Sequence, residues 1–361
     1  MKNSSLAIFQ HLTSVPTAPF HEQAVIRKTL AWIRRSLGGK VRVRKLKSGL
    51  IVDYRAAGPG PALALAAHLD HPGFHLKGVT AKGAWAILKG GHPRELLEGR
   101  SVEAFASDPP DNRPAALGVL GPAPEKGDAF RLTWTQPPGA GSRLCFGVLA
   151  LTPFELKRGW VCSRSVDDLM GCAIALQTLR QAVAGRLKAN IKVYLHRAEE
   201  VGFVGALDFA ARGHAHLEDS VISIEASRQL PGARPGQGPV IRLGDKAALF
   251  DANLIALLDE AAQALRKRRI PVQRLRLTGG TCEATAYQSF GFEAAGVALP
   301  LVNYHNGIGA KAIAPEMIRA ADASGCVELL LEAARRFPAA PLRGHWRRRL
   351  EARRRKNAKL L

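Results

Sequence analysis

Two adjacent glutamates, Glu199 and Glu200, are the first residues at which chemistry can be expected. They follow an apolar, β-type run at 191–195 and precede a helical pattern that begins near Val201. Side chains at the carboxyl end of a parallel strand point into the crevice where open α/β sheets bind ligands. Two carboxylates this close raise one pKa sharply or need a cation. A metal ion beside one glutamate and a proton-transfer role for the other would satisfy both.

Other polar side chains stand where predicted strands end or helices begin. They are His68 and Asp70 after a strand at 62–67, Asp167 and Asp168 at a helix start, Glu225 after a run at 221–224, and His305 after a strand at 295–299. Singly, an aspartate can cap a helix, a histidine can be hydrogen-bonded in the core, and a glutamate can pair with a basic residue. Together, two histidines and several carboxylates at one sheet edge suit a borderline cation such as zinc. Paired metals about 3.5–4 Å apart generate hydroxide near neutral pH.

The elements that must position these residues predict an α/β fold: a mixed, mostly parallel sheet with helices on both faces and an inserted small all-β barrel. Helical periodicity covers 5–13, 21–38, 169–184, 201–212, 251–268, 283–290 and 315–336. Strand patterns cover 41–45, 50–54, 62–67, 190–196, 220–225, 239–243, 273–277 and 295–299. Between about 73 and 164, five short β-type runs alternate with Gly- and Pro-rich turns, which is typical of a small barrel or sandwich.

The chain of 361 residues carries a formal charge of +22, and residues 341–361 alone contribute nine basic residues and one acid, or +8. Such a charge can attract nucleic acid or anionic substrates, or simply solvate the surface. We favour the solvated surface, because no nucleic-acid-binding motif accompanies the charge. Five scattered cysteines without a C-x-x-C pair fit a reducing compartment. Neither a signal peptide nor a membrane span is evident, so we expect the cytoplasm.

Five local motifs occur in a distinctive order: AHLDHPGF, SVDDLMG, AEEVGF, SIEAS and NYHN. In this order, and with the β-rich insertion in the first gap, they resemble the M42 aminopeptidases, the glutamyl and deblocking aminopeptidases related to the M20 and M28 dinuclear metallopeptidases. The resemblance runs from about residue 5 to 337. It implies a discontinuous catalytic α/β metallopeptidase domain at 1–72 and 164–340, an inserted barrel for dimerisation or a lid at 73–163, and a basic tail at 341–361.

Carried over motif by motif, the resemblance implies a role for each polar residue named above. His68 would bind one metal, with Asp70 holding its ring through a hydrogen bond. Glu225 would complete the first site, Glu200 and His305 would bind the second metal, and Asp167 would bridge the two. Glu199 would be the general base that takes a proton from the attacking water. The peptide bond between Asp167 and Asp168 is a candidate for the cis form.

The sequence departs from the family pattern at several places near the site. His71 stands where the family usually has Glu, Glu225 where Asp is common, and Cys282 where an Asp is usual. The segment around His305 reads YHNGIG instead of the family's IHS-P type. None of these changes removes a metal ligand. We expect Cys282 to be a small pocket-lining residue and not a nucleophile, because no partner for a nucleophile is evident.

The leading hypothesis is a metallo-aminopeptidase that removes N-terminal residues from short peptides through a metal-activated water. The resemblance implies two divalent metal ions per chain, zinc first and cobalt or manganese as alternatives. It also implies a homo-oligomer, a dimer or a dodecamer; we expect neither nucleic acid nor membrane as a partner. Two alternatives stay open. One is an amidase or deacylase of the same clan. The other is a basic nucleic-acid-binding protein with a vestigial metal site, motivated by the tail.

Overall fold

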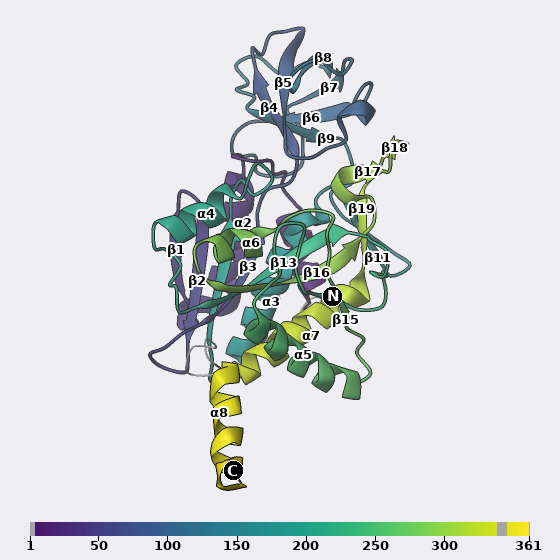
Figure 1. Ribbon diagram of the computed structural model, residues 1–361. Helices are drawn as coiled ribbons and strands as arrows, with labels where there is room; N and C mark the ends of the chain where they lie inside the picture. The colour runs from purple at the N-terminus through teal and green to yellow at the C-terminus, as the bar shows by residue number, and fades with distance from the viewer. Residues whose placement is uncertain (1–3, 338–344, 361) are drawn as a thin grey trace.

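The computed structural model describes residues 4–337 and 345–360, and its centre is an eight-stranded mixed sheet (Figure 1). The strands lie in the order β1-β2-β12-β3-β13-β16-β14-β15. Their bounds are β1 Arg42–Leu46, β2 Gly49–Arg55, β12 Asn190–His196, β3 Leu63–His68, β13 Ser220–Arg228, β16 Glu293–Leu301, β14 Val240–Arg242 and β15 Gln273–Leu275. The four central strands β12, β3, β13 and β16 are parallel. They are almost wholly buried, which explains their apolar runs.

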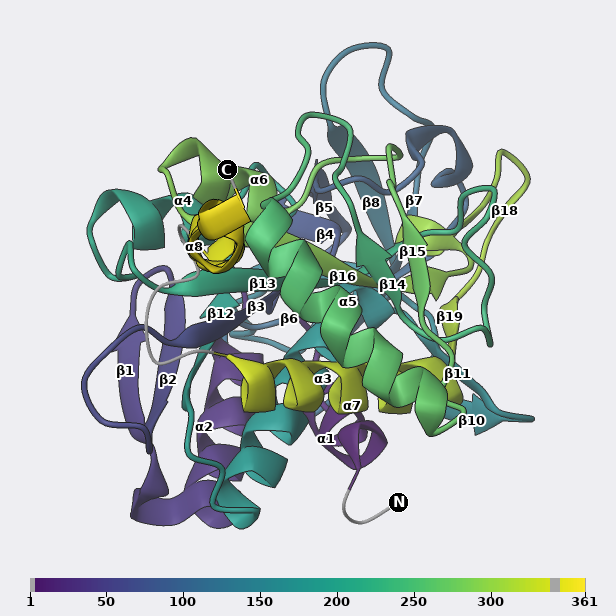
Figure 2. The same cartoon turned by 60° about the horizontal axis from the view of Figure 1, so that its bottom comes forward.

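Helices cover both faces of this sheet, as the alternation of patterns predicts. On one face α3 packs across β3, β12 and β13 (Figure 2). The helices α1, α2 and α7 pack beside α3, and α5 lies on α7. On the other face α4 and α6 pack against each other above β12, β13 and β16 (Figure 1). The helices are α1 Ser5–Leu12, α2 Gln23–Leu37, α3 Val166–Ala184, α4 Val204–Ala211, α5 Ala252–Lys267, α6 Glu283–Ser289, α7 Ala320–Arg336 and α8 His345–Asn357.

Between β3 and α3 the chain forms a closed antiparallel barrel that stands at one end of the α/β layers (Figure 1). Its strands run β4-β5-β8-β7-β6-β9, with bounds β4 Gly73–Lys77, β5 Gly83–Lys89, β8 Ala129–Gln136, β7 Ala116–Leu120, β6 Ser101–Phe105 and β9 Phe146–Leu149. The barrel has an apolar core of its own, which includes Phe74, Phe130 and Leu132. The predicted fold class, an α/β sheet with an inserted small barrel, is therefore confirmed.

A small three-stranded sheet corrects one predicted boundary. Strands β10 Glu155–Lys157, β11 Trp160–Ser163 and β19 Glu316–Arg319 pair antiparallel beside the main sheet. The helix predicted over 315–336 therefore begins only at Ala320. The physical reason is that residues 316–319 alternate between buried and half-buried and form hydrogen bonds to β11, a partner far away in the sequence. A two-stranded hairpin, β17 Gly307–Ile308 with β18 Ala312–Ile313, follows His305.

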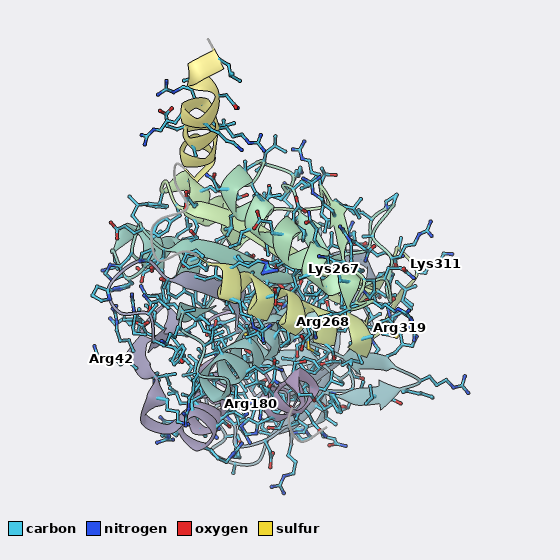
Figure 3. The ribbon with its side chains drawn as sticks, turned by 90° about the horizontal axis from the view of Figure 1, so that it is seen from below. Arg42, Arg180, Lys267, Arg268, Lys311 and Arg319 are labelled. Atoms are coloured by element: carbon cyan, nitrogen blue, oxygen red, sulfur yellow. The ribbon has the colours of Figure 1, made fainter. Side chains whose placement is uncertain are left out.

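The basic tail contains α8 and a short 3-10 turn at Ala358–Leu360, and α8 projects away from the body of the molecule (Figure 1). The first four residues of the predicted tail, 341–344, and its last residue lie outside the described residues. On the body, the labelled basic side chains in Figure 3 spread across the face and do not gather at one point. Among the described residues no helix is both long and apolar enough to cross a membrane.

Candidate metal centre

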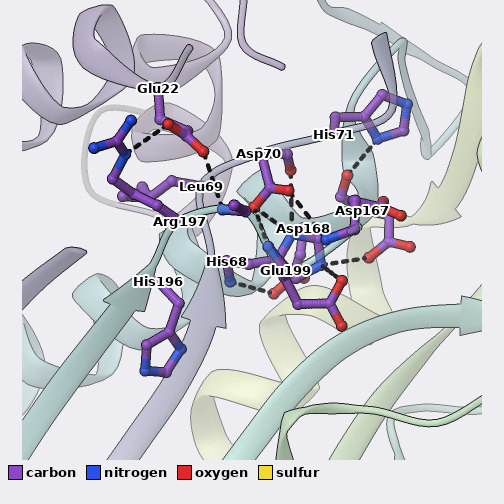
Figure 4. Close-up of polar contacts among 12 residues, drawn as sticks. Glu22, His68, Leu69, Asp70, His71, Asp167, Asp168, His196, Arg197 and Glu199 are labelled. Atoms are coloured by element: carbon purple, nitrogen blue, oxygen red, sulfur yellow. Dashed lines mark hydrogen bonds and ion pairs between the residues drawn. The ribbon is translucent and has the colours of Figure 1, made fainter. Parts of the chain in front are cut away.

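The candidate site lies at the carboxyl ends of the central parallel strands. His68 is the last residue of β3, and it pairs in register with His196 at the end of β12. The loop after β12 then carries Glu199 and Glu200. Asp167, the second residue of α3, lies near Glu199 (Figure 4). The strand expected at 220–225 is longer than predicted, because β13 continues alongside β16 as far as Arg228, and Glu225 therefore lies inside it and not at its end. The sheet thus brings together residues from four separate segments.

One group of possible ligands consists of His68, Asp167 and Glu225. One ligand atom from each lies within 4.8 Å of the others, and all three side chains are buried. Nε2 of His68 is 3.4 Å from Oδ1 of Asp167. Its Nδ1 faces Asp70, at 3.2 Å from the backbone oxygen and 3.6 Å from the carboxylate. Nε2, the nitrogen on the far side of the His68 ring from Asp70, therefore faces the Asp167 carboxylate.

A second group consists of Asp167, Glu200 and His305, again with ligand atoms within 4.8 Å of one another. Nε2 of His305 lies 3.3 Å from Oε2 of Glu200 and 3.7 Å from Oδ2 of Asp167. The two carboxylate oxygens of Asp167 thus face two different histidines, Oδ1 toward His68 and Oδ2 toward His305. A single carboxylate between two imidazoles is the arrangement expected of a ligand shared by two cations.

The electrostatics of the cluster also favour a cation. Burial raises the pKa of Glu199 well above its usual range, and the neighbouring carboxylates add to the rise. Burial likewise raises the pKa of Glu225 to about 8. Burial alone would lower the pKa of His68, but the Glu199 carboxylate and the contacts with Asp167 and Asp70 raise it well above its usual range. A divalent ion would neutralise this excess of buried negative charge.

Two buried carboxylate oxygens in the cluster, Oδ1 of Asp167 and Oε1 of Glu200, have no hydrogen-bond partner within the part of the chain that the structure describes. Buried polar atoms without partners are uncommon in folded proteins, and a role in binding an ion is one standard explanation. The donor set of imidazole nitrogens and carboxylate oxygens is the one that zinc and similar ions prefer. Both the type of the donor atoms and the lack of hydrogen bonds to two of them therefore fit a pair of divalent metals.

Asp70 supports the site through the main chain as well as through His68. Its Oδ1 accepts the backbone N–H of Glu199 at 3.0 Å (Figure 4). Its Oδ2 accepts the backbone N–H of Glu200 at 3.1 Å. Asp168 is also fully buried and accepts the backbone N–H of Gly171 at 3.1 Å. The peptide bond between Asp167 and Asp168 is cis, as the motif suggested.

Glu316 is a supporting residue that sequence reasoning missed. It is fully buried in β19, where Oε2 accepts the backbone N–H of Asp167 at 3.0 Å and Oε1 accepts that of His305 at 2.9 Å. One carboxylate thus ties together two possible ligands from distant segments. No local signal identifies it, since an acid at this position also suits the first turn of a helix.

The residues at which the sequence departs from the family pattern lie around the cluster, where they make structural contacts. Nδ1 of His71 donates to the backbone oxygen of Asp167 at 2.5 Å, and its Nε2 lies 3.0 Å from Oδ1 of Asn306. Cys282 is buried, and burial raises the pKa of its thiol to about 12, so the thiol stays protonated at neutral pH. Cys282 was expected to line the pocket, but the adjacent wall comes from Gly279, Gly280 and Thr281. The expectation was wrong because the side chain is directed into the core.

The candidate ligands line a pocket that also contains residues of a different chemistry. His68, Asp167, Glu199, Glu200, Glu225 and His305 supply carboxylates and imidazoles. The same pocket is lined by two arginines, Arg228 and Arg242, by Tyr304, and by the apolar Leu230 and Leu277. The guanidinium of Arg228 lies over the ring of Tyr304, 5.1 Å from its centroid. A bound molecule would therefore meet both carboxylates with imidazoles and guanidinium groups in one pocket.

The chain is similar in sequence to known peptidases. A family model for M42 glutamyl aminopeptidases matches residues 144–329, just over half of the chain. A protein from Zea mays described as a probable glutamate carboxypeptidase is 28% identical over 193 residues. That match covers 51% of this chain and 24% of the maize protein, so the chain spans about a quarter of that relative.

Several solved structures share the fold. A TET aminopeptidase from a marine sediment archaeon, a thaumarchaeote, has a TM-score of 0.77 at 17% identity and covers 94% of this chain and 99% of its own. The TET1 peptidase of Pyrococcus horikoshii, described as assembling into a tetrahedron or a large octahedral shell, gives 0.73 at 21% identity over 92% and 99%. An aminopeptidase from Desulfurococcus kamchatkensis gives 0.74 at 18% identity over 93% and 95%.

Proposed function

The chain belongs to the M42 family of glutamyl aminopeptidases, and we propose that it is a dinuclear metal-dependent aminopeptidase that removes N-terminal residues from short peptides. Membership of the family makes it a peptide hydrolase. The finer proposal rests on one observation above all. The two oxygens of Asp167 face Nε2 of His68 and Nε2 of His305, at 3.4 Å and 3.7 Å.

We assign the first metal to His68 and Glu225, the second to Glu200 and His305, and the bridge between them to Asp167. Zinc suits these ligands, with cobalt or manganese as alternatives. When bound, the pair supplies a Lewis acid for the scissile carbonyl and lowers the pKa of the attacking water. The protein holds its ligands rigidly, because the backbones of Asp167 and His305 are both bound by Glu316.

Glu199 is our candidate for the general base. Its side chain lines the pocket, and its Oε2 lies 3.7 Å from Nε2 of His68. The carboxylate would accept a proton from the attacking water and deliver it to the amine that leaves when the peptide C–N bond breaks. Asp70 holds the Glu199 main chain in place for this transfer.

Metal binding and hydrolysis can be separated in one experiment. Metal-free protein titrated with Zn²⁺ should bind two equivalents per chain and regain hydrolysis of short peptides. The variant Glu199→Gln should bind the same two equivalents but lose at least about 100-fold in kcat, the usual size of a general-base contribution. Asp53→Asn, at a half-buried residue of β2 whose carboxylate pairs with Arg55, serves as the matched control and should keep both properties. Metal-free protein that still hydrolyses peptides would contradict the proposal.

The charge of the pocket suggests which first residue is preferred. Arg242 is buried, with 3% of the residue exposed, and it lines the pocket that holds the carboxylates. Its Nη1 donates to Oγ of Ser227 at 3.3 Å, whereas its Nε has no hydrogen-bond partner among the described residues. A substrate that carries both a free amine and an acidic side chain would match both the carboxylates and the arginines of the pocket. We therefore propose Glu or Asp as the preferred N-terminal residue, in line with the name of the family.

The alternatives are tested with the same protein. An amidase or deacylase of the same clan would cleave N-acylated amines in preference to aminoacyl substrates, so a panel of both kinds separates the two activities. A nucleic-acid-binding protein would bind RNA or DNA in a salt-sensitive manner that removal of residues 341–361 abolishes.

We also propose that the chain forms a homo-oligomer. The support is the shared fold with peptidases described as a dodecamer and as tetrahedral or octahedral shells. Light scattering after size-exclusion chromatography would give the mass of the assembly directly. A species with the 38.8 kDa mass of one chain, at the concentrations used for activity, would contradict this part of the proposal.

A further inference from the structure

One of the proposed metal ligands, His305, is oriented by a segment of the inserted barrel. Nδ1 of His305 donates to the backbone oxygen of Gly91 at 3.0 Å. In return, Nδ1 of His92 donates to the backbone oxygen of His305, also at 3.0 Å. Gly91 and His92 follow β5, a barrel strand hydrogen-bonded to β4 and β8. Two reciprocal hydrogen bonds therefore join the barrel to the second ligand group.

The contact with Gly91 decides which ring nitrogen of His305 carries the proton. A carbonyl oxygen can only accept, so Nδ1 must be the protonated nitrogen. Nε2 then keeps its lone pair, and this is the nitrogen that faces Glu200 and Asp167. Partners of this kind fix both the tautomer and the orientation of metal-binding histidines.

We propose that Gly91 and His92 are positioning residues of the second metal site, so that the placement of the barrel sets the affinity of this site. The inference rests on the proposed dinuclear function. Gly91 fits because it has no side chain: a Cβ there would lie 2.4 Å from Nδ1 and 2.7 Å from Cε1 of His305. His92 is itself fixed, buried at 5% exposure with its ring beside Phe74 and His71.

The first ligand group is held in a different way. Nδ1 of His68 faces Asp70, which lies two residues further along the same segment of the main sheet. The atoms that orient His68 therefore come from the α/β layers, whereas those that orient the His305 ring come from the barrel. Displacement of the barrel loop should consequently weaken the second site and leave the first site intact.

Calorimetric titration of metal-free protein with Zn²⁺ tests this directly, because it counts sites without an activity measurement. Wild type should show two sites. In Gly91→Ala the new methyl group displaces the His305 ring, and the second site should be lost while the first keeps its Kd within about threefold. Gly139→Ala is the matched control in the barrel, since a Cβ there meets only Ser142 Oγ at 3.8 Å. It should keep both sites.

Substitutions at His92 provide a second test in case the Gly91→Ala variant misfolds. His92→Phe fills the same space without a donor and should weaken the second site about 10- to 100-fold, the usual effect of losing an outer hydrogen-bond partner. His92→Asn places an amide N–H close to the position of Nδ1 and should restore most of the affinity. Two unchanged sites in both Gly91→Ala and His92→Phe would overturn the inference and leave the proposed function standing. Fewer than two sites in wild type would overturn the dinuclear proposal itself.

Discussion

The carboxylate of Asp70 accepts the backbone N–H of Glu199, with 3.0 Å between Oδ1 and the nitrogen, and so fixes the proposed general base through its main chain. The neighbouring Oδ2 binds the next backbone N–H, that of Glu200, at 3.1 Å. The proposed base and a proposed ligand are adjacent in the chain. One buried carboxylate therefore sets the position of both.

This relationship predicts the effect of Asp70→Asn. An amide has a single acceptor oxygen, so one of the two backbone N–H groups would face an NH₂ group and lose its partner. We expect kcat/KM to fall about 10- to 100-fold, with weaker metal binding at the first site. Steady-state kinetics and Zn²⁺ titration would measure the two effects. Asp53→Asn again serves as the control, and an unchanged kcat/KM in Asp70→Asn would show that this positioning is not needed.

Arg242→Met should change substrate preference. Loss of a charge-assisted hydrogen bond to an acidic side chain costs about 1.5–3 kcal/mol, or roughly 10- to 100-fold in kcat/KM for Glu-p-nitroanilide. The value for Leu-p-nitroanilide should change much less. Arg274→Met, at an exposed ion pair with Asp259, is the control. Metal content should be measured alongside, since Arg242 also lowers the pKa of Glu225. Equal losses on both substrates would rule out a role in specificity.

The pair His21 and His75 predicts a loss of stability in acid. Nε2 of His21 lies 3.0 Å from Nδ1 of His75, and the His21 ring stacks on Phe146 of the barrel. Burial, with help from His75 and Arg197, lowers the pKa of His21 to about 4. In the unfolded chain the pKa returns to 6.5, so between pH 6.5 and 4 the unfolded state binds more protons. Stability is therefore fully present above pH 6.5 and falls as the pH drops toward 4.

The titration of His21 should lower the free energy of unfolding by about 2–3 kcal/mol as the pH falls from 6.5 to 4. His21→Phe keeps the stack on Phe146 but cannot titrate, so its urea-unfolding free energy should fall by that much less between pH 7 and 4 than that of wild type. His216→Gln, at an exposed histidine, should follow wild type. Identical pH dependence in wild type and His21→Phe would exclude this histidine as the source.

Much of the architecture could be predicted because it depends on local patterns. The buried runs of β3 and β12 and the spacing of apolar residues in α2 indicate their own structure without knowledge of their neighbours. The clustering of His68, Asp167, Glu200 and His305 was also predictable. Parallel strands place their carboxyl ends at one edge, so residues at such ends meet.

Features that depend on distant partners could not be predicted. Glu316 contacts Asp167 across 149 residues, and Gly91 contacts His305 across 214. Neither contact leaves a periodic or local signature, since each is a single hydrogen bond between a main-chain group and a distant residue. The same holds for the length of β13 beyond Glu225 and for the first turn wrongly assigned to α7. Both were decided by a partner strand, β16 in one case and β11 in the other.

The wide spacing of the site residues also has a consequence for biosynthesis. The ligand groups draw on segments from His68 to His305, and the carboxylate that ties two of them together, Glu316, comes later still. During translation the N-terminal layers and the whole barrel emerge before the last of these segments exists. A growing chain thus cannot assemble the complete site until more than four-fifths of it has been synthesised. The proposed metal centre therefore cannot form on a nascent chain that lacks its last segments.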